Sequence, residues 1–193
     1  MCGIVGYLGK GIAQEPLIDG LRRLEYRGYD SAGVAFHDGD SFSLARKTGR
    51  VENLAKSLKA ECSHSSLGIA HTRWATHGAV TVSNTHPHLS HNKKFALVHN
   101  GVIENFSSLK NFLLKEGVQF YSDTDSEVLC NLIAYHYEQL PAGEDRFIDA
   151  VSTALGKSRG AYGIAVMCID YPDMMVGARR GSPLVVGIGE DAN

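Results

Sequence analysis

The chain opens with Met1-Cys2-Gly3-Ile4-Val5-Gly6-Tyr7-Leu8, in which a cysteine holds the second position. Gly3–Leu8 is a short and mostly apolar run, which predicts a buried strand. Removal of Met1 would make Cys2 the first residue and place a free α-amine beside its thiol. An α-amine has a pKa of about 7.7–8.0, so part of it is neutral near pH 7 and can accept the proton of a nucleophile. Cys2 is therefore either a nucleophile that carries its own base or a small apolar residue at the start of a strand.

The composition indicates one soluble globular domain. The chain has 193 residues, of which 44% are hydrophobic and 21% are charged, so it can bury a sizeable core. The formal net charge is -2 without a long run of one sign, which gives no reason to expect nucleic acid or a membrane surface as a partner. We find no bilayer-spanning apolar stretch and no signal peptide, which favours the cytoplasm and free thiols.

Neither the cysteines nor the histidines indicate a metal or cofactor site. The four cysteines are widely spaced and form no C-x-x-C pair, so a thiolate zinc site is not expected. His86, His88 and His91 lie close together, but Pro87 interrupts regular structure and no nearby carboxylate could orient a ligating imidazole. We expect these histidines in a solvated or hydrogen-bonded loop, with a metal-binding module as the alternative.

The spacing of apolar residues predicts both strands and helices. The strands fall into groups that look antiparallel, with helices between the groups, which favours an α+β protein in which helices cover sheets. Asp38-Gly39-Asp40 predicts a hairpin turn, and Thr124-Asp125-Ser126-Glu127 is a capping-box pattern at the start of a helix. The predicted strands are Gly3–Leu8, Ala32–His37, Ser41–Lys47, Leu67–Thr72, Lys94–His99, Tyr162–Ile169, Met174–Ala178 and Leu184–Ile188, and the other predicted helices are Pro16–Leu24, Val51–Ala60, Asn105–Glu116 and Glu144–Leu155.

The segment His71–Gly78 is a candidate for substrate contact because it leaves a predicted strand and enters a long polar loop. The planar guanidinium of Arg73 suits a carboxylate. Trp74, the only tryptophan, could act as a lid. The alternative is a surface arginine beside a tryptophan that packs on the edge of the core.

Asn100-Gly101 and Asp125 offer the other groups that a nucleophile needs. Asn100-Gly101 ends a predicted strand, and its side-chain amide and backbone N–H could donate to an oxyanion, with a simple turn as the alternative. Asp125 in the first turn of a helix could face a substrate ammonium, although the helix dipole alone favours an acid there. Together with Cys2 and Arg73, these groups suit an amino-acid amide, which points to glutamine or asparagine.

Several motifs resemble those of the glutamine amidotransferases with an N-terminal nucleophile. Cys2-Gly3-Ile4-Val5-Gly6 is similar to the start of that superfamily. Longer motifs are specific to a smaller group within this superfamily. They resemble the glucosamine-6-phosphate synthases over essentially the whole chain. These longer motifs are Leu21–Gly33, His71–Gly78, Val98–Asn105, Ser122–Glu127 and Arg159–Gly163.

The resemblance implies a four-layer αββα sandwich of the N-terminal-nucleophile hydrolase kind. It implies that Cys2, once exposed, attacks the side-chain amide carbon of glutamine and forms a thioester. Ammonia leaves, and water then releases glutamate; no cofactor takes part. In the complete proteins of this kind, the ammonia aminates fructose 6-phosphate to glucosamine 6-phosphate, a step of amino-sugar biosynthesis.

Residue roles follow from the same resemblance. Arg73 matches the family's clamp for the α-carboxylate of glutamine. Asp125 matches the residue that receives the α-amino group. Asn100 and Gly101 match the oxyanion hole.

Loop residues also match the family. Trp74 matches the tryptophan that closes over the site and helps to gate ammonia transfer. Thr76 and His77 match positions that line the same end of the site. Arg27 matches an Arg-Gly element near the nucleophile.

The resemblance further implies that residues 1–193 form one glutaminase domain of the type 2 class, without the sugar isomerase domains of relatives. Related glutaminase domains run somewhat past Asn193, so closing strands are expected to be missing. We expect the full-length enzyme to be a homo-oligomer. The alternatives are the glutaminase domain of another amidotransferase, such as glutamine PRPP amidotransferase, or a silent glutamine-binding module if Met1 is retained.

Overall fold

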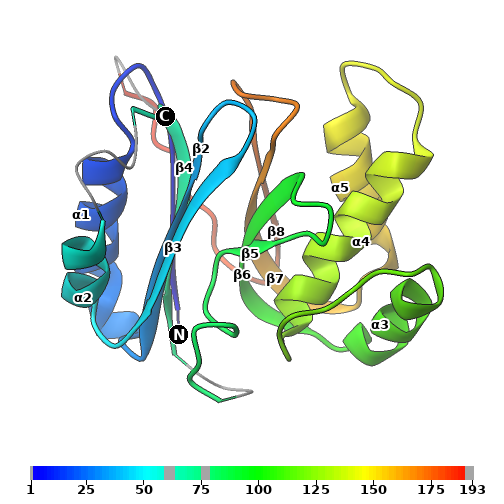
Figure 1. Ribbon diagram of the computed structural model, residues 1–193, viewed down its shortest axis with the longest axis horizontal. Coiled ribbons are helices and arrows are strands. Elements are labelled where there is room, and N and C mark those ends of the chain that lie inside the picture. Colours follow the sequence, from blue (N-terminus) through cyan, green and yellow to red (C-terminus); the bar gives the residue numbers. More distant parts are fainter. Residues whose placement is uncertain (1, 59–63, 75–78, 190–193) are drawn as a thin grey trace.

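Two stacked antiparallel sheets with helices on both outer sides make up the protein (Figure 1). This computed structural model describes residues 2–58, 64–74 and 79–189. The helices and sheets follow one another as four layers, helices, sheet, sheet and helices. The predicted α+β class and αββα arrangement are therefore confirmed.

The first sheet consists of β1 (Gly3–Leu8), β2 (Ser31–His37), β3 (Phe42–Thr48) and β4 (Leu67–Arg73). Its strand order is β1-β4-β2-β3, and every neighbouring pair is antiparallel. β2 and β3 form the predicted hairpin, with Gly39 at a φ of 72° in the turn. In the β1–β4 pair Gly3 lies opposite Thr72, so the start of the chain lies beside the end of β4.

The second sheet consists of β5 (His88–Leu89), β6 (Phe95–Ile103), β7 (Gly160–Cys168) and β8 (Met175–Arg180). These strands are adjacent in chain order, and each neighbouring pair is antiparallel. β5 was not predicted, because two residues after Pro87 carry no readable alternation. Its pairing with Leu97 and Ala96 of β6 defines it.

The helices are α1 (Gln14–Leu24), the 3-10 turn η1 (Glu25–Arg27), α2 (Val51–Ser57), α3 (Phe106–Lys115), α4 (Asp125–Gln139) and α5 (Arg146–Lys157). Only one of the two hydrogen bonds of the predicted capping box forms at α4, in which the Thr124 side chain accepts from the Glu127 N–H. The Glu127 carboxylate does not return to Thr124. It accepts from the backbone N–H groups of Tyr121 and Ser122 instead, which ties the preceding loop to the helix.

Apolar clusters fill the spaces between the layers, one under each group of helices and one between the sheets. Because side chains alternate along a strand, His71 shares the inter-sheet face of β4 with Ile69. Asn100 likewise shares the inter-sheet face of β6 with Val98. Buried members of the inter-sheet cluster are Ala35, Leu67, Ile69, Ala96, Val98, Ala165 and Met167.

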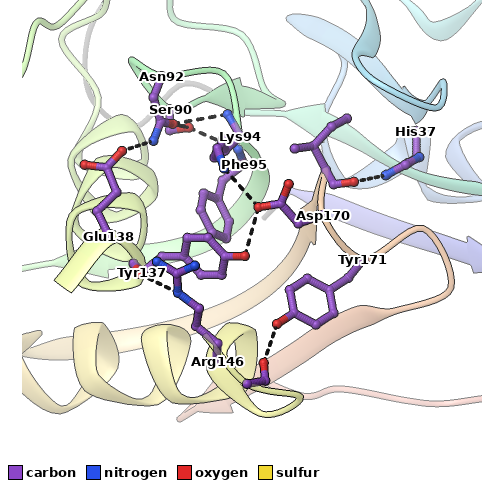
Figure 2. Close-up of polar contacts among 12 residues, drawn as sticks. His37, Ser90, Asn92, Lys94, Phe95, Tyr137, Glu138, Arg146, Asp170 and Tyr171 are labelled. Atoms are coloured by element: carbon purple, nitrogen blue, oxygen red, sulfur yellow. Dashed lines mark hydrogen bonds and ion pairs between the residues drawn. The ribbon is translucent and has the colours of Figure 1, made fainter. Parts of the chain in front are cut away.

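A polar network closes the molecule at the end where β6 begins (Figure 2). The Asp170 carboxylate accepts from Lys94 Nζ at 3.0 Å and from the Tyr137 hydroxyl at 2.9 Å. His37 Nε2 of the first sheet donates to the Ile169 carbonyl at 3.0 Å. These bonds join both sheets and α4 at the end opposite to Asn100-Gly101.

The predicted strand Leu184–Ile188 is wrong, because residues 183–189 have no regular structure. Val185 and Ile188 are each 89% exposed. Apolar alternation signals a strand only if a neighbouring strand supplies hydrogen-bond partners, and none pairs with this segment within the described ranges. No helix in those ranges is long and apolar enough to cross a membrane.

The packing of α1 on the first sheet predicts a large effect of Leu17→Ala. Leu17 is fully buried in the cluster under α1 and α2. Its truncation should lower the free energy of unfolding by about 2–5 kcal/mol through lost burial and a cavity. Leu114→Ala is the matched control, since Leu114 on α3 is 51% exposed and should change stability by only about 0.5 kcal/mol or less. Urea titrations measure both, and equal losses would contradict the assignment of this core.

Candidate active site

A cavity of about 130 Å³ opens at the end of the inter-sheet layer. It is lined by residues from the start of the chain, the end of β4, the end of β6 and the start of α4. Six of the predicted site residues line it: Cys2, Arg73, Trp74, Asn100, Gly101 and Asp125. The other lining residues are His86, His99, Val102, Phe106, Asp123, Thr124 and Ser126.

Cys2 is held at the cavity by hydrogen bonds next to the paired ends of β1 and β4. The Gly3 N–H donates to Thr72 Oγ1 at 3.1 Å, and the Trp74 N–H donates to Cys2 Sγ at 3.1 Å. A side chain at Gly3 would collide with Leu24, so glycine allows the end of α1 to lie this close to β1. Burial raises the pKa of the Cys2 thiol above its ordinary value of 9.0, and the Trp74 N–H opposes this. The thiol therefore needs a base to react near neutral pH.

Asn100 and Gly101 lie beside Cys2 at the end of β6. Asn100 Nδ2 donates to the Cys2 carbonyl at 3.0 Å, and Asn100 Oδ1 lies 2.9 Å from His71 Nε2. Gly101 has a φ of 131°, and a Cβ there would overlap the Ala161 carbonyl. Glycine is therefore required for the backbone to pass the cavity at this point.

Asp125 has a fixed orientation in the first turn of α4. Its Oδ2 accepts from the Ile103 N–H at 2.7 Å, which anchors the helix to the end of β6. Its Oδ1 lies 4.0 Å from His99 Nδ1, and His99 Nδ1 is hydrogen-bonded to Ser126 Oγ at 2.9 Å. Burial lowers the pKa of His99, while the Asp125 charge opposes that shift. The second carboxylate oxygen of Asp125 thus faces a neutral imidazole at the cavity wall.

Arg73 and Trp74 form the side of the cavity where β4 ends. Arg73 is 5% exposed, and its Nη1 donates to the Ala79 carbonyl at 3.2 Å. Trp74 is 46% exposed and packs edge-to-face on Tyr29 with ring centroids 5.3 Å apart. The arginine is therefore a buried charge at the cavity, whereas the tryptophan lies at its rim.

Three predicted site residues remain predictions, for two different reasons. Thr76 and His77 lie outside the described residues. Arg27 lies at the end of η1, is partly buried, and donates to the Tyr26 hydroxyl at 3.0 Å. The structure does not place Arg27 in the lining of the cavity.

Buried histidines around the cavity are the main feature that the sequence did not predict. The expectation of a solvated or hydrogen-bonded loop is wrong for His86, which is 6% exposed and whose ring nitrogens have no partner among the described residues. His88 is 2% exposed and lies in β5, but it is hydrogen-bonded as expected, since its Nε2 lies 3.0 Å from Thr124 Oγ1. Gly33 on β2 has no side chain, so the His86 carbonyl can pass directly over that strand. His86 stacks on His71 with ring centroids 4.2 Å apart and meets His88 edge-to-face at 4.7 Å. Within the described ranges, no group of three His, Cys, Asp or Glu residues is placed to hold a metal ion.

Comparisons with known proteins show which proteins the chain is similar to. Residues 55–142 match the glutamine amidotransferase domain family. The chain is 51% identical to glutamine–fructose-6-phosphate aminotransferase (isomerizing) of Chlamydia abortus and 50% identical to that of Zymomonas mobilis, each over 100% of this chain and 31% of the relative. A solved glutamine PRPP amidotransferase of B. subtilis covers 100% of this chain and aligns over 40% of its own, with a TM-score of 0.81 and 27% identity.

The chain carries a domain of the glutamine amidotransferase class. Within that class its sequence is similar to the N-terminal part of the glutamine–fructose-6-phosphate aminotransferases. The chain spans 31% of the length of the first of these relatives.

Acidification is expected to destabilise the fold through the buried histidines. Burial lowers the pKa of His71 from 6.5 to about 4 and the pKa of His86 and His88 well below 6.5. The ordinary pKa of 6.5 applies to each histidine in the unfolded chain, and the lowered pKa applies in the folded protein. Between these two values the unfolded chain binds more protons than the folded one, so stability falls as the pH drops below about 6.5. The contribution of His71 to this loss is complete near pH 4.

Denaturant titrations over this pH range measure the effect. Each buried histidine adds a slope of at most about 1.4 kcal/mol per pH unit within its window. His86→Phe should reduce the slope without breaking a hydrogen bond, because neither ring nitrogen of His86 has a partner among the described residues. A slope that stays the same in His86→Phe would contradict a neutral, buried His86.

Proposed function

We propose that this protein hydrolyses the side-chain amide of L-glutamine to glutamate and ammonia, with Cys2 as the nucleophile. The observation that carries the proposal is the convergence of Cys2, Arg73, Asn100 and Asp125 from separate segments on one cavity. Each of these residues supplies a different group that amide hydrolysis of an amino acid requires. The family of the chain supports the same reaction.

The reaction has two stages with one covalent intermediate. The Cys2 thiol attacks the amide carbon of glutamine, and its proton passes to the base. Collapse of the tetrahedral intermediate breaks the C–N bond and transfers a proton to the departing ammonia, which leaves a thioester on Cys2. Water then attacks the thioester carbon, and glutamate leaves as the thiol is restored. Asn100 Nδ2 and the Gly101 N–H are the proposed donors to the oxyanion of both stages.

The base that we propose is the α-amine of Cys2 after removal of Met1. Burial raises the pKa of the thiol, so little thiolate forms at neutral pH without a base. An α-amine has a pKa of about 7.7–8.0 and is therefore suited to accept the thiol proton. An amide nitrogen between Met1 and Cys2 is not basic, so the unprocessed chain would bind glutamine without cleaving it.

Charged and polar groups define the proposed glutamine site. Asp125 Oδ1 receives the α-ammonium, and the Arg73 guanidinium clamps the α-carboxylate. Trp74 at the rim acts as a lid. Thr76, His77 and Arg27 stay proposed site residues through their match to the family motifs alone.

For the complete protein, we propose glutamine–fructose-6-phosphate aminotransferase activity. Residues 1–193 would form its glutaminase domain, and its ammonia would aminate fructose 6-phosphate bound by sugar isomerase domains outside this chain. Identities of 51% and 50% to such aminotransferases support this assignment over the glutamine PRPP amidotransferase alternative, for which the identity is 27%. Ammonia incorporation by the complete protein into fructose 6-phosphate rather than into PRPP tests it.

Cys2→Ala should abolish glutaminase activity, because no thioester can form. Release of glutamate and ammonia from glutamine is the measurement, and intact mass reports whether Met1 has been removed. Cys130→Ala is the control, since Cys130 is fully buried in α4 outside the cavity lining and should retain turnover. Turnover that survives Cys2→Ala would refute the proposed mechanism.

Asp125→Asn should raise the KM for glutamine by roughly 10- to 100-fold, because a charge-assisted hydrogen bond contributes about 1.5–3 kcal/mol. The asparagine can still accept from the Ile103 N–H, so α4 should keep its place. Asp149→Asn is the matched control, because Asp149 lies in the first turn of α5. Equal KM values in both variants would support a helix-dipole role for Asp125. A glutamine analogue without the α-amine should bind wild-type and Asp125→Asn protein alike.

A further inference from the structure

We propose that His71 is a positioning residue that orients the side-chain amide of Asn100, and through it the oxyanion donor beside Cys2. This inference rests on the proposed glutaminase function and adds a residue to its machinery. His71 does not line the cavity itself. It acts on the reaction only through Asn100.

The two side chains meet across the inter-sheet layer. His71 lies near the end of β4 in the first sheet, and Asn100 lies near the end of β6 in the second. His71 is 1% exposed, and its Nε2 lies 2.9 Å from Asn100 Oδ1. The hydrogen bond therefore joins the two sheets at the wall of the cavity.

The Cys2 carbonyl determines which way the Asn100 amide points. A carbonyl oxygen can only accept, and it lies 3.0 Å from Asn100 Nδ2, so the NH₂ group must face Cys2. Oδ1 then faces His71, which must donate through Nε2–H. One hydrogen of the Asn100 NH₂ is used by the Cys2 carbonyl. The other is left for the cavity that Asn100 and Cys2 both line.

The surroundings of His71 hold the ring in this role. His86 stacks on it with ring planes 29° apart and centroids at 4.2 Å. Burial lowers the pKa of His71 to about 4, so near neutral pH the ring is uncharged and carries one N–H, at Nε2. Its Nδ1 has no partner among the described residues, which agrees with an unprotonated nitrogen there. The His99 ring and the Arg73 guanidinium also oppose a charge on the His71 ring, whereas its hydrogen bonds with Asn100 and with the His99 backbone favour one.

Loss of this donor should affect the transition state more than glutamine binding. Without His71, Asn100 Oδ1 has no fixed partner, and the amide can rotate its NH₂ group away from the developing oxyanion. The oxyanion forms only after attack by Cys2, so the interaction contributes to kcat and little to KM.

His71→Phe tests the proposal because it keeps a flat ring against His86 and removes the donor. Its kcat for glutamine hydrolysis should fall about 10- to 100-fold with KM within about threefold, since loss of a whole oxyanion donor costs roughly 10²–10³ in kcat. His71→Gln restores an N–H donor and should recover part of the loss. His37→Phe is the matched control: it also removes a buried imidazole hydrogen bond, to Ile169, and should keep kcat unchanged.

A double-mutant cycle separates positioning from general damage. In an Asn100→Ala background, His71→Phe should change kcat by less than about twofold, because the residue through which His71 acts is gone. Labelling of Cys2 by a glutamine-like electrophile counts the folded sites in each sample. If His71→Phe does not fold, His71→Leu carries the same cycle.

The outcomes distinguish the two proposals. A wild-type protein that lacks Met1 and does not hydrolyse glutamine would refute the proposed function. An active wild type with unchanged kcat in His71→Phe, or with losses that multiply in the double variant, would overturn the role of His71 alone.

Discussion

Close packing of the two sheets places the candidate catalytic groups within reach of one another. The layer between the sheets contains small residues such as Ala35, Ala96 and Ala165. Because these side chains are short, an imidazole on one sheet and an amide on the other can form a direct hydrogen bond of 2.9 Å. Larger side chains in this layer would separate His71 from Asn100 and widen the cavity beside Cys2.

Antiparallel pairing of β1 with β4 positions the candidate nucleophile. The pairing ends at Gly3 and Thr72, so Cys2 lies beside Trp74 and its thiol accepts from the Trp74 N–H. Partial burial there raises the pKa of the Cys2 thiol, so the thiol needs a base such as the proposed α-amine. The fold therefore presents a thiol that depends on a free chain start for its activation.

Local patterns in the sequence predicted much of this structure. Gly3–Leu8 forms a strand with the predicted bounds, and the Thr124 cap begins α4 as expected. Residues such as Cys2 and Asp125 were recognisable because a nucleophile and a helix-start acid are local features. The segment Leu184–Ile188 shows the limit of this approach. Its apolar alternation is typical of a strand, but strand formation depends on a partner that no local pattern reports.

The amino-acid sequence by itself determined the α+β class of the fold and singled out Cys2, Arg73, Asn100 and Asp125, which line the cavity. Only the tertiary structure decided that His86 and His88 are buried and that His71 faces Asn100. The physical reason is that periodicity and capping act between residues a few positions apart. The burial of a histidine and the partner of an amide depend instead on segments that meet after the sheets have stacked.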